Sequence, residues 1–157
     1  MRFDIVSDTH GYLSKELLDQ LQGADLIVHA GDICSESDFQ TLNKIAFTHA
    51  CKGNNDWGFQ YDTFVTPMVR FFAAGLRWEV CHYRERLDLE TCEVAICGHT
   101  HRPFVTRDAR TGVLVMNPGS PTFPRAGGPT MGRIIAEDGK IVSAKIIELD
   151  DKDLDWR

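Results

Sequence analysis

The feature that most constrains the fold is a regular alternation in the first third of the chain. Apolar runs of strand length lie at residues 2–7, 25–30 and 46–52. Between them, residues 14–23 and 35–45 carry apolar side chains at helical spacing, with Ser14 and either Ser35 or Ser37 as N-caps. Parallel strands need crossover connections of this length, and such units are right-handed. We therefore expect strand–helix–strand–helix–strand in one parallel sheet.

The second half of the chain is dominated by hairpin signals. Paired apolar segments flank Ala74-Gly75 and Asp138-Gly139, both typical turn sequences. Residues 84–92 are polar and allow only a short helix. The expected strands are 67–73, 76–82, 94–97, 104–106, 113–116, 133–136 and 140–148. The whole pattern predicts an α/β (α+β) fold, in which two sheets pack as a β-sandwich flanked by helices.

The 157 residues fit a single domain, residues 1–157, with a charged tail from about residue 150 that we expect to fray. Hydrophobic residues make up 43% of the chain and the net charge is −6. This charge argues against nucleic acid as a general partner, because phosphate backbones are bound by clustered Lys and Arg. It does not exclude a small phosphate-ester substrate, since bound metal cations reverse the charge locally.

The five cysteines are odd in number and form no C-x-x-C pair, which is typical of reduced thiols in a cytosolic protein. The N-terminus opens a strand and does not resemble a signal peptide, and no apolar run reaches membrane-spanning length. We expect a cytoplasmic protein with no membrane contact. The sequence is compatible with a monomer or a homo-oligomer.

Polar groups follow the predicted strands at the points where each one ends. In open α/β sheets, ligands bind outside the carboxyl ends of the strands, so groups far apart in sequence converge there. Asp-x-His and Gly-Asn-Asn-Asp are ordinary turn sequences when taken alone, and His82 alone is more often a surface residue. Their joint placement instead favours a two-metal site. The candidate ligands are Asp8, His10, Asp32, Asn54, His82, His99 and His101. His29 and His49 lie inside apparent strands and are assigned structural roles.

These motifs resemble those of the calcineurin-like metallophosphoesterases. The matching segments are Asp8-x-His10, Gly31-Asp32, Gly53-Asn54-x-Asp56, Gly98-His99-Thr100-His101 and Asn117-Pro118-Gly119-Ser120, which occur in the order typical of the family. The chain is most similar to the small YfcE-type phosphodiesterases of bacteria and archaea. The resemblance implies a β-sandwich with its active site at the carboxyl ends of the strands.

The resemblance also implies a ligand set for two divalent ions. The first would be held by Asp8, His10, Asp32 and His101, and the second by Asp32, Asn54, His82 and His99. Asp32 would therefore bridge them. Mn²⁺ is the expected metal, with Ni²⁺, Fe, Zn²⁺ and Mg²⁺ as alternatives that the ligands do not distinguish.

The implied activity is hydrolysis of a phosphate ester, most typically a diester, by attack of a metal-bridging hydroxide. His82 and Asn54 would help to neutralise the phosphoryl oxygens, and Asp56 would support the site. The sequence does not identify the physiological substrate.

Three departures from the family pattern bear on this activity. Asn55 stands where the wider superfamily has a His that protonates the leaving group, so we expect a preference for acidic leaving groups. Tyr83 and Arg84 replace the Gly and the second His of a His-Gly-His motif. Arg84 is then either a phosphate-binding or a solvated residue. The segment between His82 and Gly98 is also short. Arg125 matches a basic position of the family and is a further substrate-binding candidate.

Two other functions fit the same pattern. The first is a non-catalytic scaffold, for which the retromer subunit of this fold is the precedent, although that subunit lacks some of the ligand histidines. The second is a dinuclear hydrolase acting on a non-phosphate ester. Retention of every expected ligand in this chain favours the phosphoesterase.

Overall fold

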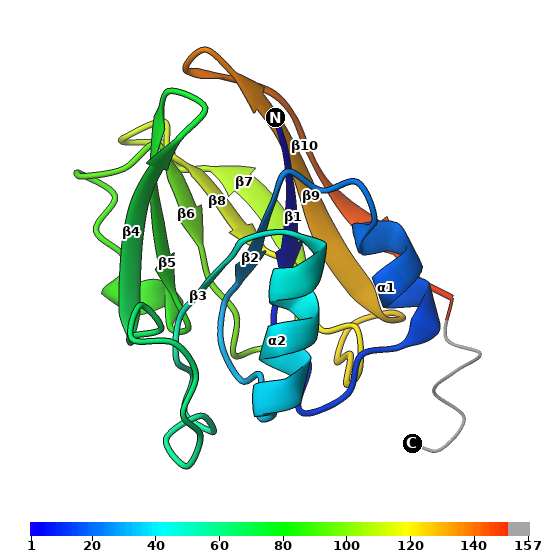
Figure 1. The fold of residues 1–157 in the computed structure, drawn as a ribbon. Helices are drawn as coiled ribbons and strands as arrows, with labels where there is room; N and C mark the ends of the chain where they lie inside the picture. Colours follow the sequence, from blue (N-terminus) through cyan, green and yellow to red (C-terminus); the bar gives the residue numbers. More distant parts are fainter. Residues whose placement is uncertain (151–157) are drawn as a thin grey trace.

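The computed structural model describes residues 1–150, so the predicted fraying of the tail falls on residues outside this range. Two helices, one short 3-10 helix (η1) and ten strands form within it (Figure 1). In chain order they are β1 (Arg2–Val6), α1 (Lys15–Leu21), β2 (Leu26–His29), α2 (Glu36–Ile45), β3 (Thr48–Ala50), β4 (Met68–Ala73), β5 (Leu76–Cys81), η1 (Arg84–Arg86), β6 (Val94–Ile96), β7 (Phe104–Arg107), β8 (Leu114–Asn117), β9 (Thr130–Glu137) and β10 (Lys140–Glu148).

The first sheet contains the predicted parallel unit. Its order is β10-β9-β1-β2-β3, with β1, β2 and β3 parallel and the β9–β10 hairpin added antiparallel to β1. Ser14 caps α1 by accepting a hydrogen bond from the backbone N–H of Leu17, and Ser35, rather than Ser37, caps α2. The local signals therefore predicted both crossovers correctly.

The second sheet has the order β4-β5-β6-β8-β7. The outer pairs β4–β5 and β7–β8 are antiparallel hairpins, the first of them the one predicted at Ala74-Gly75, but β5, β6 and β8 at the centre run parallel. This parallel centre was not predicted, because β6 has only three residues and its connections lack a regular α-helix. Each central strand therefore also brings a carboxyl end to one edge of the sheet.

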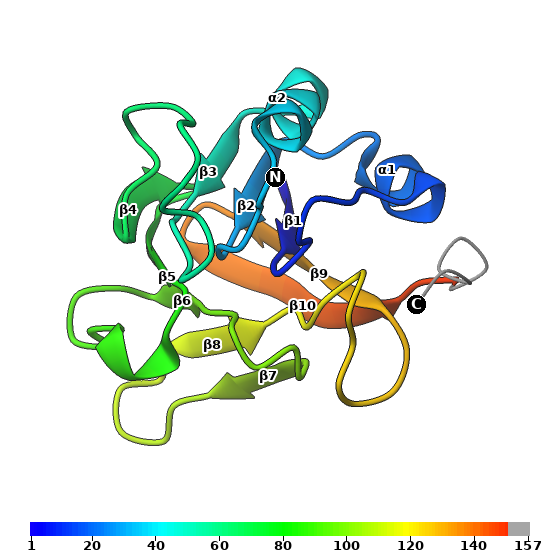
Figure 2. The same ribbon diagram turned by 90° about the horizontal axis from the view of Figure 1, so that it is seen from below.

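The two sheets pack face to face, with α1 and α2 on the outer face of the first (Figure 2). Strand alternation explains the layers. Phe3 and Ile5 face Trp78 and Ile96 in the core between the sheets, whereas Val6 faces Leu17 beneath α1. On the outer face of the second sheet, the segment containing η1 replaces a helix and contributes Leu87 and Leu89 to a small apolar cluster. The predicted sandwich flanked by helices is confirmed, with both α-helices on one side.

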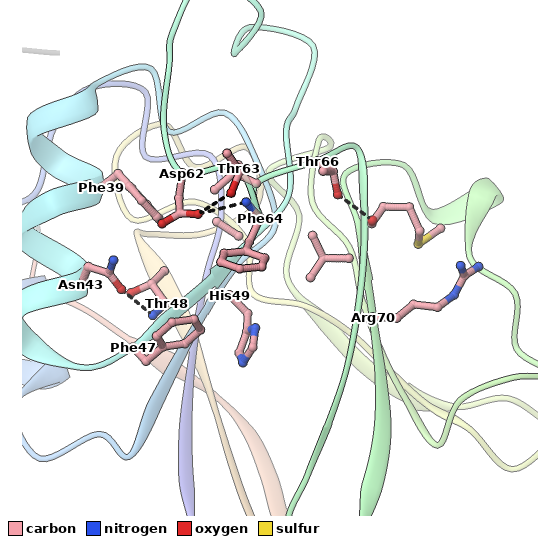
Figure 3. A pocket seen from close by; sticks show the side chains of 14 residues that line it. Phe39, Asn43, Phe47, Thr48, His49, Asp62, Thr63, Phe64, Thr66 and Arg70 are labelled. Carbon is pink, nitrogen blue, oxygen red and sulfur yellow. Dashed lines mark hydrogen bonds between the residues drawn. The ribbon is translucent and has the colours of Figure 1, made fainter.

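The edge strands β3 and β4 approach one another beside α2. Cys51 and Thr66 form a parallel bridge between the sheets, and the ring of His49 stacks on Phe71 with centroids 3.7 Å apart. A pocket of about 470 Å³ opens here, with Phe47, His49 and Phe64 on its wall (Figure 3). None of the predicted metal ligands lines it. No helix within residues 1–150 combines the length and apolar character needed to cross a membrane.

The stacked ring of His49 leads us to predict that the contact between β3 and β4 becomes less stable in acid. Burial lowers the pKa of His49 to about 4, against about 6.5 in an unfolded chain. A histidine with a lowered folded pKa favours folding when neutral, so stability should fall as pH decreases from 6.5 to 4. We expect His49→Phe to reduce this loss by roughly 1–2 kcal/mol, after allowance for partial exposure of the ring. Urea denaturation of both proteins at pH 7 and pH 4.5 measures the difference, and parallel losses would contradict the assignment.

Candidate metal centre

The loops after β1 and β2 continue to pair beyond the strands and so converge at one edge of the sheet. The backbone N–H of Asp8 donates to Gly31 (2.9 Å), and that of His10 donates to Asp32 (3.0 Å). From the second sheet, the turn after β6 is tied to the end of β5 by the bond from Gly98 N–H to the His82 carbonyl (3.1 Å). Both sheets therefore present their loops to one site.

The Asn117-Pro118-Gly119-Ser120 segment holds these loops together. The Asn117 amide donates to the Gly98 carbonyl (3.0 Å), and the Ser120 hydroxyl donates to the Asp8 carbonyl (2.8 Å). A motif that the sequence identified only as a turn thus joins the first metal loop to the last.

Five predicted ligands adopt the left-handed backbone region. Eight non-glycine residues in the described part of the chain have positive φ, and five of them are Asp8, His10, Asp32, His99 and His101, with φ between 51° and 74°. Left-handed conformation costs an L-residue roughly 1–2 kcal/mol. Such outliers concentrate at functional sites, where the surrounding structure enforces them.

The motif glycines allow the carboxylates to approach the backbone closely. A Cβ on Gly53 would lie 2.2 Å from Oδ1 of Asp32, and one on Gly98 would lie 2.7 Å from Oδ2 of Asp8. Any side chain at either position would displace a predicted metal ligand. These glycines therefore fix the position of the two carboxylates.

Asp8, His10 and His101 form the first group of potential ligands. Nε2 of His101 lies 3.3 Å from Oδ1 of Asp8 and 3.3 Å from Nε2 of His10. Asp8, Asp32 and His82 form a second group, in which Nε2 of His82 lies 3.4 Å from Oδ2 of Asp32. These distances match the spacing of donors around a common ion.

The geometry shares Asp8 between the two groups, whereas the family resemblance assigns the bridge to Asp32. Asp32 also lies between them, because its Oδ2 is 3.7 Å from Nε2 of His10. Asn54 joins the second group, with its Oδ1 3.0 Å from Nε2 of His82. His99 stands apart: its side chain is exposed, and its ring centroid lies 5.1 Å from that of His82.

The hydrogen bonds of the histidines show that the site suits cations. Nδ1 of His82 faces the Ala30 carbonyl (2.7 Å), and Nδ1 of His101 faces the Phe123 carbonyl (2.6 Å). Both Nδ1 atoms must donate, so both Nε2 lone pairs point inward. There they meet Oδ1 of Asn54 and Oδ1 of Asp8, and the latter atom is buried and accepts no hydrogen bond. Such converging lone pairs need a positive charge among them, which divalent metal ions would supply.

The pKa values follow the same electrostatics. Burial of the Asp8 carboxyl favours its neutral form, but the adjacent imidazoles of His10 and His101 outweigh this and hold its pKa well below the usual range. The contact with Asp8 raises the pKa of His101. Burial opposes protonation of His82, but Asp32 and Asp8 raise its pKa overall. The carboxylates of Asp8 and Asp32 therefore favour positive charge on the imidazoles of His82 and His101.

Asp56 supports the site from beneath and does not face the predicted ligands. Its buried carboxylate accepts backbone N–H bonds from Asp32 (2.7 Å), Ile33 (3.0 Å), Cys34 (3.1 Å) and Gly53 (2.7 Å), and the hydroxyl of Tyr61 (2.8 Å). It therefore fixes the loops that carry Asp32 and Asn54.

Asn55 also contacts a predicted ligand. Its backbone N–H and its side-chain amide donate to the two carboxylate oxygens of Asp32, at 2.9 and 3.0 Å. From the sequence we expected Asn55 to matter only near the leaving group. In the structure its side-chain amide orients the carboxylate of Asp32.

His29 contributes more than its sequence position indicated. Burial lowers its pKa to about 4, so the ring is neutral at physiological pH. Its Nδ1 accepts the N–H of Gly31 (3.1 Å), which leaves Nε2 to donate to the Thr9 hydroxyl (2.9 Å). The ring thereby braces both metal loops from within β2. No local sequence signal distinguishes such a histidine from an ordinary buried one.

The two substrate-binding candidates, Arg84 and Arg125, lie in different surroundings. Arg125 lines a hollow together with His10, His101, Phe123 and Pro124. The guanidinium of Arg84 instead stacks on Phe104, with its central carbon 4.6 Å from the ring centroid.

The carboxylate of Asp56 generates a prediction about stability. Asp56→Asn replaces one accepting oxygen by a donor that faces backbone N–H groups, so we expect a loss on the order of 3 kcal/mol in unfolding free energy. Tyr61→Phe is the matched control, because it removes a single donor to the same carboxylate and should cost about 1 kcal/mol. Urea denaturation measures both variants. Equal stability of the two would show that the backbone bonds to Asp56 contribute little.

Comparisons with known proteins identify the family of this chain. Residues 1–139 match the family model of the calcineurin-like phosphoesterase superfamily domain. A probable metallophosphoesterase from Methanocaldococcus jannaschii is 31% identical over 163 residues, covering 96% of this chain and 83% of the relative.

Solved structures share the fold at lower identity. An archaeal phosphodiesterase has a TM-score of 0.77 at 22% identity, covering 94% of this chain and 100% of that chain. YfcE, a phosphoesterase from Escherichia coli, has a TM-score of 0.68 at 22% identity, covering 92% and 98%. Vps29 from Entamoeba histolytica, in complex with Zn²⁺, has a TM-score of 0.72 at 19% identity, covering 94% and 97%. With the family model matched over most of its length, this chain belongs to the calcineurin-like phosphoesterase superfamily.

Proposed function

We propose that the protein is a phosphodiesterase that uses two divalent metal ions, expected to be Mn²⁺, to hydrolyse a small phosphate ester in the cytoplasm. The convergence of Asp8, Asp32, Asn54 and inward-facing imidazole nitrogens at one edge of the sandwich carries the proposal. Bound there, such ions would act as Lewis acids on the phosphoryl group and lower the pKa of water.

The side chains of the protein would divide the remaining tasks among them. Asp8, His10, Asp32 and His101 would hold the first ion, and Asp32, Asn54, His82 and His99 the second. Asn54 and His82, whose Oδ1 and Nε2 atoms lie 3.0 Å apart, would also help to neutralise the phosphoryl oxygens. His29 and Asp56 position the loops and would not contact the substrate.

Arg125 is the stronger of the two arginine candidates for binding the scissile phosphate. It shares a hollow with His10 and His101, and its positive charge opposes protonation of His101. An ester seated in this hollow would place its phosphoryl group beside the first-ion ligands. Phe123, on the same wall, would contact an apolar part of the ester.

A scaffold function is the second candidate, and the similarity to Vps29 supports it. That relative is itself a zinc complex, so metal binding alone would not separate a scaffold from an enzyme. Hydrolysis of an ester is therefore the deciding measurement.

The metal centre generates the first functional prediction. With saturating Mn²⁺, the protein should bind two ions and hydrolyse bis(4-nitrophenyl) phosphate. His101→Ala should lower kcat/KM by at least about 100-fold, because it removes a ligand and the partner of Asp8. His49→Ala serves as the control, since it removes a histidine remote from the predicted ligands. Full metal occupancy without turnover, with Mn²⁺, Ni²⁺, Mg²⁺ or Zn²⁺, would support the scaffold instead.

Asn55 generates a second functional prediction, because an amide cannot protonate a departing alkoxide at neutral pH. Diesters with aryl leaving groups should react much faster than those with alkyl leaving groups. Asn55→His should raise the alkyl rate relative to the aryl rate by at least about tenfold, since general acid catalysis contributes about 10²–10⁴. Metal content must be measured in parallel, because Asn55 also binds Asp32. Similar aryl and alkyl rates in the unaltered protein would exclude the proposed preference.

A further inference from the structure

Arginine pairing divides this molecule into two regions. Of the ten arginines in residues 1–150, five form ion pairs with carboxylates. These are Arg2 and Arg133 with Asp4, Arg70 with Glu79, Arg77 with Glu93, and Arg110 with Glu90. A sixth, Arg107, donates to the Gly112 carbonyl. In a chain with a net charge of −6, carboxylates are abundant, so pairing is the normal state here.

The other four arginines behave differently. The guanidinium groups of Arg84, Arg86, Arg102 and Arg125 form no hydrogen bond or ion pair with any residue in the range 1–150. All four are exposed. Each follows closely on a predicted ligand, His82 or His101, or on Phe123, whose carbonyl holds His101. The arginines without a hydrogen-bonded or ion-paired guanidinium in the described chain therefore all follow residues of the metal centre closely in sequence.

Two of these arginines are held in place by aromatic rings. The guanidinium carbon of Arg86 lies 4.7 Å from the ring centroid of Tyr83, and the Tyr83 ring lies 4.9 Å from that of His99. Arg84 stacks on Phe104 in the same way. Stacking occupies the face of a guanidinium and leaves its N–H edges available, the arrangement that binds phosphate.

Tyr83 acquires a role in this arrangement. At this position the sequence departs from the family pattern, and the ring lies between the guanidinium of Arg86, which packs over its face, and the predicted metal ligand His99, which it contacts at a tilt of 58°. Arg86 is thus connected to His99 through Tyr83, and Arg84 follows His82 by two residues, while Arg125 shares a hollow with His10 and His101.

This surplus of charge indicates the class of substrate. If the proposed function is correct, two metal ions already neutralise the scissile phosphate, and one arginine would suffice to orient it. We infer that the substrate is a small organic ester carrying at least one phosphate group besides the scissile one, that Arg84 and Arg86 bind the additional group, and that Arg125 orients the scissile one. We call these three residues the arginine rim.

A pair of substrates that differ by one phosphate tests the inference. Thymidine 5′-(4-nitrophenyl phosphate) and its 3′-phosphorylated form share the scissile bond and the leaving group. In low salt, KM should be at least about tenfold lower for the 3′-phosphorylated form, since each charge-assisted contact to an exposed arginine contributes a few-fold. At 0.5 M salt the ratio should fall below about threefold, because surface charges are then screened.

Substitution of the arginines tests whether the rim causes the lower KM for the 3′-phosphorylated substrate. The triple variant Arg84→Gln, Arg86→Gln and Arg125→Gln should bring the KM ratio close to one. Its charge-matched control is Arg77→Gln, Arg107→Gln and Arg110→Gln, which alters a hollow lined by none of the predicted ligands and should keep the ratio. Equal KM values for the two substrates in the unaltered protein would overturn the inference, as would a triple rim variant that retains the preference.

A binding measurement separates this inference from the proposed function. Butane-1,4-bisphosphonate and butylphosphonate cannot be hydrolysed and differ by one anionic group. Calorimetry should show at least about tenfold tighter binding of the bisphosphonate, lost in the rim variant and kept in the control. If neither ester is hydrolysed while this difference persists, the proposed hydrolase fails and the rim stands. Hydrolysis of both esters without any preference for the bisphosphonate would support the proposed hydrolase and overturn the role of the arginine rim.

Discussion

The carboxylate of Asp56 is the interaction on which the centre depends most. Parallel strands deliver loops to a common edge, but they do not fix the backbone of those loops. Here one buried carboxylate accepts four backbone N–H groups, from three consecutive residues after β2 and from Gly53 after β3. Buried donors left without partners are expensive, so this single group sets the conformation of both loops. The positions of Asp32 and Asn54 follow from it.

The second sheet is joined to this frame by equally specific bonds. Asn117 and Ser120 hold the turn after β6 and the loop after β1, and His29 braces the loops after β1 and β2 from within the sheet. Most of these contacts use backbone atoms as partners. The metal centre is therefore a meeting of loops whose geometry is set beneath the ligands, in agreement with the preorganisation that catalytic sites require.

Much of this could be predicted from the sequence, because the relevant signals are local. Apolar periodicity, the cap at Ser14 and the turns at Ala74-Gly75 and Asp138-Gly139 predicted the elements, and motif order predicted the family. The parallel centre of the second sheet escaped prediction, since a three-residue strand such as β6 carries too little pattern. The bracing by His29, the bond from Asn55 to Asp32 and the stack on Tyr83 also escaped it. Each depends on distances between segments that no local pattern encodes.

The left-handed backbone of five predicted ligands has a consequence for how this fold diversifies. Side chains that would bind metal occupy positions better suited to glycine, and the buried Oδ1 of Asp8 lacks a hydrogen-bond donor. Replacement of such a ligand by glycine, which adopts this conformation readily, would relieve backbone strain worth about 1 kcal/mol or more at each position. A lineage released from catalysis would thus gain stability by discarding its ligands, with the sandwich left intact. Because stability would increase as ligands are lost, we expect both enzymes and non-catalytic binding proteins to occur with this fold.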